Sequence, residues 1–220
     1  GGRLIYIGAG SSGRIAALDA VEIPVTYGVT EDKVMALVAG GLADAAVEIE
    51  SAYEEDASSV PDLLMLNLKR EDVVVGISAS GNAYYVQSGL GYAKAIGAQT
   101  TLLQVEEAQE PYPFCDRVIA MHSGNEVVAG STRMKAGTAT KRVLNMLTTT
   151  AMVLLGKVEG SYMVDLVCTN QKGEDRAAMI LNKLYGVSKE EMLRLLRKHH
   201  NRLCDVVNEV RSKKEGHGVG

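Results

Sequence analysis

Short apolar runs alternate, along the first part of the chain, with longer segments in which apolar residues recur at helical spacing. The runs are rich in β-branched residues and apolar on both faces, as strands buried under helices are. They lie at Arg3–Ile7, Lys33–Val38, Asp72–Ile77, Gln99–Val105 and Arg117–Met121. Helices are expected between them, at Ser12–Val21, Leu42–Glu55 and Tyr84–Ile96. This rhythm predicts an α/β fold with a five-stranded parallel sheet between helices.

The pattern changes after Met121. Lys135–Leu155 is apolar on nearly all sides, which favours a helix buried in a core or against another subunit. A loop is expected at Gly156–Ser161. We therefore place a first domain over residues 1–155 and a helical C-terminal appendage over residues 156–220.

The appendage has two helical patterns, at Thr169–Tyr185 and Ser188–Arg211. A capping box from Ser188 to Glu191 opens the second one. The last eight residues, Lys213–Gly220, are polar and glycine-rich, so we expect them to be frayed.

Composition narrows the class of protein. The 220 residues are 46% hydrophobic and 23% charged, which excludes wholesale disorder. The net charge of −4 disfavours a nucleic-acid partner, and no apolar run reaches the ~20 residues that span a bilayer. The chain opens without Met and runs directly into a strand pattern, without a secretory signal, so we expect a fragment of a longer protein.

Cysteine and histidine usage argues against disulfides and metals. The three cysteines are odd in number and far apart, at Cys115, Cys168 and Cys204, which fits a reducing cytoplasm. The four histidines form no metal-binding spacing. We therefore expect no metal and no organic cofactor.

The first predicted strand ends in a glycine-rich turn with the sequence GAGSSGR at Gly8–Arg14. Its G-x-G-x-x-G spacing is the dinucleotide fingerprint, but no carboxylate ends the second strand to hold a ribose. Hydroxyls at a helix N-terminus suit a phosphate or sugar hydroxyls, so the candidates for binding are Gly10, Ser11, Ser12 and Gly13. The alternative is a tight turn with Ser12 as N-cap and no ligand.

The third predicted strand ends in a similar turn, GISASGN at Gly76–Asn82. The carboxyl ends of parallel strands meet at the sheet edge where open α/β sheets bind ligands. Two hydroxyl-rich loops there favour a phosphorylated small molecule. The candidates from this loop are Ser78, Ser80, Gly81 and Asn82.

A third segment, GSTRMKAGTATK at Gly130–Lys141, opens the long predicted helix. Cations in a first helical turn oppose the helix dipole, so they indicate a docked anion or polar sugar. The candidates are Ser131, Thr132, Arg133 and Lys135. The alternative is a solvated helix start with Ser131 or Thr132 as N-cap.

Two acidic stretches are candidates for acid–base chemistry. Glu22 follows the first helix between Val21 and the pair Ile23-Pro24, and partial desolvation there would raise the pKa of its carboxyl toward that of a general acid. The alternative is a solvated glutamate at a helix end. The run Glu48–Asp56 reads as a solvated helix face.

Four runs together resemble one family. They are GGRLIYIGAGSSGR, GISASG, GSTRMKAGTATKRVLNMLTTTAM and GKVEGSYMVDLVCTN. They are similar to the sugar isomerase (SIS) domain of the N-acetylmuramic acid 6-phosphate etherases and, more distantly, of the glucokinase regulatory protein. The resemblance covers roughly residues 1–180. It implies a flavodoxin-like sheet, a homodimer with sites near the subunit interface, and binding of a hexose 6-phosphate.

The resemblance also implies a lyase reaction without a cofactor. The family cleaves the lactyl ether at C3 of N-acetylmuramic acid 6-phosphate. A base removes the proton at C2 of the open-chain sugar, an acid protonates the departing ether oxygen, and water adds to the unsaturated intermediate.

Residue by residue, the resemblance is uneven. The family's acid lies in a D-A-S-E-C-P-P-T-like run, and Glu22 keeps that carboxylate. The family's base lies in an A-V-E-G-A-E-D-like run, where this chain has Tyr53 with Glu54 beside it. Adjacent helical residues point ~100° apart, so either the register shifts to use Glu54 or the base is missing. The family's A-S-G-R-T-P-Y loop is here Ala79–Tyr85, without the Arg and the Thr-Pro.

Four interpretations remain open from the sequence. The first is an etherase-like lyase with Glu22 as acid and Glu54 as the doubtful base. The second is a non-catalytic phosphosugar-binding regulator, which Tyr53 and the altered Asn82–Tyr84 loop favour. The third is an aldose–ketose phosphosugar isomerase, and the fourth is a nucleotide-binding Rossmann protein.

Overall fold

The computed structural model describes residues 1–41, 57–105, 112–168 and 170–216. Contacts divide the chain into two compact units. The first comprises Gly1–Glu22 and Thr30–Thr148, and the second comprises Ile23–Val29 and Thr149–Gly220. The helix predicted at Leu42–Glu55 and the candidate base Glu54 lie outside the described residues.

The first unit is built on a parallel sheet of five strands in the order β2-β1-β3-β4-β5. The strands are β1 (Leu4–Gly8), β2 (Val34–Val38), β3 (Val73–Ile77), β4 (Gln99–Gln104) and β5 (Arg117–Ala120). All five were predicted to within a residue or two at each end. This order, with a reversal between β1 and β3, is that of flavodoxin-like folds, so the predicted fold class is confirmed.

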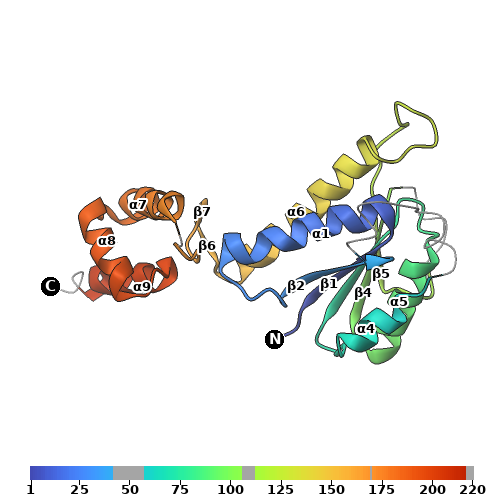
Figure 1. The fold of residues 1–220 in the computed structure, drawn as a ribbon, viewed down its shortest axis with the longest axis horizontal. Helices are drawn as coiled ribbons and strands as arrows, with labels where there is room; N and C mark the ends of the chain where they lie inside the picture. The colour runs from blue at the N-terminus through green and yellow to red at the C-terminus, as the bar shows by residue number, and fades with distance from the viewer. Residues whose placement is uncertain (42–56, 106–111, 169, 217–220) are drawn as a thin grey trace. The chain divides into compact units, whose positions relative to one another are not determined.

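Helices cover both faces of this sheet. Figure 1 shows α1 (Gly10–Tyr27) and α6 (Lys135–Leu154) on one side, and α4 (Val60–Met65) and α5 (Tyr84–Ile96) on the other. Alternation along β1 explains the packing, because Ile5 and Ile7 join the core under α4 and α5 while Tyr6 reaches a residue of α1. Helix α4 was missed because its six residues are too few to show a helical period.

The amino ends of β1 and β3 are joined by a buried ion pair. The Arg3 guanidinium contacts the Asp72 carboxylate at 2.6 Å, and Asp72 also accepts from the backbone N–H groups of Arg3 and Lys69 at 2.9 Å each. Burial raises the pKa of the Asp72 carboxyl, but these hydrogen bonds more than offset it and lower the pKa to about 2.

The second unit has a hairpin and three helices. The hairpin pairs β6 (Val158–Glu159) with β7 (Tyr162–Met163), where the sequence predicted a plain loop. The helices are α7 (Gln171–Tyr185), α8 (Lys189–Lys198) and α9 (Leu203–Gly216), which confirms a helical C-terminal part. Their apolar faces share one core cluster.

The single helix predicted over Ser188–Arg211 is wrong. It breaks between α8 and α9, where His200 and Asn201 adopt positive φ values of 51° and 62°. This break is held by hydrogen bonds to the preceding segment, from Cys168 N–H to Asn201 O and from Leu203 N–H to Leu166 O. Helix α9 extends to Gly216, and the fraying expected over Lys213–Gly220 stays a prediction.

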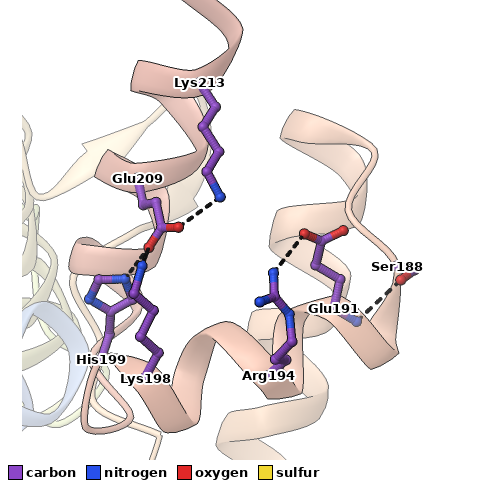
Figure 2. Close-up of polar contacts among 7 residues, drawn as sticks. All are labelled: Ser188, Glu191, Arg194, Lys198, His199, Glu209 and Lys213. Carbon is purple, nitrogen blue, oxygen red and sulfur yellow. Dashed lines mark hydrogen bonds and ion pairs between the residues drawn. The ribbon is translucent and has the colours of Figure 1, made fainter.

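Polar side chains also connect the end of α8 to α9 (Figure 2). The Glu209 carboxylate contacts Lys198 Nζ at 2.7 Å, His199 Nε2 at 2.5 Å and Lys213 Nζ at 2.7 Å.

At the start of α8, Ser188 Oγ accepts from Glu191 N–H at 3.2 Å, which confirms half of the predicted capping box. The Glu191 carboxylate itself accepts from Arg194.

Substituting Asp72 with Asn should lower the free energy of unfolding at pH 7 by about 2 kcal/mol, the linkage value of the pKa shift. Because the folded-state pKa is depressed, this contribution is present above about pH 4 and is lost as the pH falls through about 2. Denaturant titrations at pH 7 and pH 2.5 measure it, with Glu71→Gln as the exposed control. A deficit in Asp72→Asn that stays constant between the two pH values would contradict the assignment.

Candidate functional site

The loops after β1 and β3 leave the sheet side by side. The last residues of these neighbouring strands, Gly8 and Ile77, are paired in register. The chain then diverges to α1 on one face and α5 on the other, which makes this the topological switch point of the sheet. Ligands of open α/β folds bind at such points.

The turn after β1 brings the start of α1 against the strand. A Cβ on Gly13 would lie 2.6 Å from Gly8 O and 2.7 Å from Val38 Cγ1, so a larger residue would push the helix away. The first turn of α1 contains no acidic residue. Ser11 lies there, and its Oγ accepts a 3.1 Å hydrogen bond from Arg14. The positive end of the helix dipole therefore carries hydroxyls and a guanidinium.

The conformation of the β3–α5 loop is fixed by buried residues, and the tip of the loop is exposed. The buried Ser78 Oγ accepts from Ala83 N–H at 3.5 Å. Gly81 has φ +77°, and a Cβ there would lie 2.6 Å from the Gln104 side-chain oxygen, so the site requires glycine. Ser80 and Asn82 are exposed. Ser78 and Gly81 thus fix the loop, and the side chains of Ser80 and Asn82 are accessible at its tip.

A cavity of about 940 Å³ opens between the N-terminal parts of α1 and α6. Ser11, Arg14, Ile15, Ser123, Arg133, Met134, Lys135, Thr138, Ala139 and Arg142 line it. Four of these residues are cationic and none is acidic. Within the described residues, Arg133 and Arg142 make no hydrogen bond or ion pair. A cavity with this lining favours an anion.

A carboxylate from the loop before α6 caps this helix. The two Glu126 oxygens accept from Ala136 N–H at 2.9 Å and Lys135 N–H at 3.1 Å, and the first of these bonds is the main cause that lowers the pKa of the Glu126 carboxyl. Lys135 Nζ donates to Asn125 O at 2.7 Å. Glu126 offsets the unfavourable placement of cations in this turn. The sequence did not reveal it because eight loop residues separate Glu126 from the helix.

Helices α1 and α6 are fixed to β1 through a buried carboxylate, Asp19. Its oxygens accept from Tyr6 Oη at 3.0 Å, Asn145 Nδ2 at 2.5 Å and Thr148 Oγ1 at 3.2 Å. Asp19 is only 2% exposed. Burial, and then the nearby Asp19, raise the pKa of the Tyr6 phenol, which remains a donor. This network sets the spacing between the two helices whose first turns line the cavity.

The structure brings together only part of the predicted site. Ser11, Arg133 and Lys135 line the cavity, whereas Ser131 and Thr132 precede α6 outside its lining. Arg142 was missed. Its spacing after Lys135, seven residues on the same helix, would have placed it on the same face.

Glu22 does not line the cavity. It is exposed and lies eight residues beyond Arg14, about 12 Å along α1. Its neighbour Val21 is 67% exposed, so the expected desolvation of Glu22 is wrong for the single chain.

Comparisons with known proteins agree with this geometry. The model of the glucokinase regulatory protein N-terminal SIS domain matches residues 1–94. The solved structure of the E. coli CFT073 protein c3406 superposes with a TM-score of 0.51 at 17% identity, over 72% of this chain and 73% of that one. At that identity the superposition shows the fold alone.

Two curated relatives are much closer in sequence. An N-acetylmuramic acid 6-phosphate etherase of Geobacillus thermodenitrificans is 48% identical over 194 residues, covering 88% of this chain and 66% of the relative. N-acetylmuramic acid 6-phosphate etherase 2 of Vibrio parahaemolyticus is 48% identical over 196 residues, covering 89% and 65%. The chain thus spans slightly less than two thirds of the length of these relatives.

The sheet order and the switch-point loops agree with the match of residues 1–94 to the class of SIS domains. Within that class, the chain is similar in sequence to the N-acetylmuramic acid 6-phosphate etherases. In the ranges that the structure describes, every helix is too short or too polar to cross a membrane.

Replacing Asp19 with Ala should lower the free energy of unfolding by about 3 kcal/mol, because buried donors lose their acceptor. Tyr6→Phe removes one donor and should cost about 1.5 kcal/mol. Denaturant titration measures both, and Glu31→Ala provides an exposed carboxylate as control. If Asp19→Ala were as stable as that control, Asp19 would not hold the helices together.

Proposed function

We propose that this chain binds a hexose 6-phosphate at the carboxyl edge of its sheet and acts as an etherase-like carbon–oxygen lyase. Its substrate would be N-acetylmuramic acid 6-phosphate or a related amino-sugar 6-phosphate with a C3 ether. The observation that carries the proposal is the cation-lined cavity beside two hydroxyl-rich loops. The similarity to N-acetylmuramic acid 6-phosphate etherases at 48% identity supports the reaction.

The reaction needs a base, an acid and water. The base removes the C2 proton, which is acidified by the neighbouring aldehyde of the open-chain sugar. The C3–O bond then breaks, and a carboxylic acid protonates the departing lactate oxygen. Water adds its hydroxyl to C3 and a proton to C2, which gives N-acetylglucosamine 6-phosphate and D-lactate. Glu22 is our candidate acid. Glu54 remains the doubtful candidate base, since Tyr53 occupies the position of the family's carboxylate.

A second copy of this chain would bury Glu22, which is exposed in the single chain. Leu18 and Val21 on α1 are 49% and 67% exposed, and Met146 on the adjacent α6 is 61% exposed. An exposed apolar face of this kind favours a subunit interface. In a homodimer through this face, Glu22 would lie beside Val21 at the interface, shielded from bulk water.

We also place the protein in the cytoplasm. Its three cysteines, Cys115, Cys168 and Cys204, are free thiols, as in proteins of reducing compartments. Burial is the main cause that raises the pKa of Cys168 and of Cys204 to about 11, so both thiols are kept protonated.

A regulator without catalysis is the second candidate, favoured by the match to the glucokinase regulatory protein and by Tyr53. Incubation with N-acetylmuramic acid 6-phosphate in deuterated water separates the candidates by NMR. Lactate release with deuterium at C2 supports the lyase. Exchange at C2 without lactate supports an isomerase, and hexose-phosphate binding with neither signal supports the regulator.

Glu22→Gln should slow D-lactate release by ~10²–10⁴-fold with little change in substrate affinity, because it removes the general acid. An enzymatic D-lactate assay gives kcat and KM. Glu31→Gln, an exposed glutamate outside the cavity, is the matched control and should behave as wild type. Equal rates for both variants would remove Glu22 from the mechanism.

A further inference from the structure

The proposed substrate carries two anionic groups. One is the phosphate on C6, and the other is the carboxylate of the lactyl substituent on C3. The product that keeps the sugar has only the phosphate. A site that distinguishes substrate from product by charge therefore needs a second anion-binding position.

The described residues provide two chemically different anion positions. The β3–α5 loop and the start of α1 offer backbone N–H groups and the hydroxyls of Ser80 and Ser11, a set that suits the tetrahedral oxygens of a phosphate. The cavity between α1 and α6 offers guanidinium groups. A planar guanidinium fork matches a carboxylate through two parallel hydrogen bonds.

Ser11 links the two positions. It lines the cavity, and it lies in the first turn of α1, directly after the strand that neighbours β3. A hexose with its phosphate at the loops can therefore direct its C3 substituent into the cavity.

Among the cavity cations, Arg142 is the best placed for the second anion. Lys135 is held by Asn125 O, and Arg14 contacts Ser11. Arg133 precedes α6, in the same segment as Ser131 and Thr132. Arg142 lies within the helix, seven residues beyond Lys135, and has no partner among the described residues. It lines the cavity from within a helix, and none of the described lining residues is acidic.

We propose that Arg142 is a specificity-determining residue that binds the carboxylate of the C3 substituent, while the loops bind the 6-phosphate. This inference rests on the proposed function. It predicts that the protein favours sugar phosphates with an acidic C3 ether over the same sugars with a neutral C3 group.

The test compares two ligands that share the phosphate. Arg142→Gln should raise the KM for N-acetylmuramic acid 6-phosphate by ~10–100-fold, the loss expected for a charge-assisted pair. Its Kd for N-acetylglucosamine 6-phosphate, measured by calorimetry, should stay unchanged. Arg142→Lys keeps the charge but lacks the two parallel donors of a guanidinium. Its KM should lie between those of wild type and Arg142→Gln. Arg70→Gln removes an exposed arginine before β3, at the other edge of the sheet, and should leave both values as in wild type.

The outcomes separate the two proposals. If Arg142→Gln weakens both ligands equally, or neither, the assignment of Arg142 to the carboxylate is overturned. If wild type binds both sugars but releases no lactate, the lyase fails, and calorimetry with the uncleaved N-acetylmuramic acid 6-phosphate gives the same comparison for Arg142. If wild type binds neither sugar, phosphosugar binding fails, and the inference fails with it.

Discussion

The buried carboxylate of Asp19 is the interaction on which the site depends. It accepts hydrogen bonds from β1 through Tyr6 and from α6 through Asn145 and Thr148. A buried carboxylate is costly without partners, so this network specifies one arrangement of the three elements. The two helices begin at the carboxyl edge of the sheet, and their relative position decides whether Ser11 and Arg142 face one cavity.

Electrostatics at this edge is local and not a property of the whole chain. The net charge is −4, yet the described residues that line the cavity between α1 and α6 include four cations and no carboxylate. Holding like charges together disfavours the empty site, and an anionic ligand relieves that repulsion. Glu126 compensates part of this positive charge, because it caps α6 although it does not line the cavity. The fold therefore holds the cations in place before an anion binds.

The strands and the switch-point loops could be predicted because each depends on local sequence. Buried β-branched runs end in glycines and serines, which fixes both the sheet and its ligand-binding edge. The break between α8 and α9 could not be predicted. Leu196 and Leu203 are seven residues apart, which keeps the helical phase of the apolar face across the break, and neither Gly nor Pro marks it. The break depends instead on backbone pairing with Leu166 and Cys168.

Two of the site residues that were missed have roles that arise only when the chain is folded. Asp19 and Glu126 looked like ordinary helix and loop residues, and only packing shows that one joins three elements and the other caps α6. Glu22 is the reverse case, a residue that was predicted from the sequence. The resemblance identifies it as the acid, yet in the single chain it is exposed and does not line the cavity.

A crystal structure with N-acetylglucosamine 6-phosphate bound tests the central claim most directly. We expect the phosphate to lie against the β1–α1 and β3–α5 loops, with C3 of the sugar directed toward the cavity that Arg142 lines. A sugar bound at the carboxyl edge in the opposite orientation, with its phosphate among the cavity arginines, would contradict the assignment of the two anion positions. Binding anywhere away from this edge would contradict the site itself.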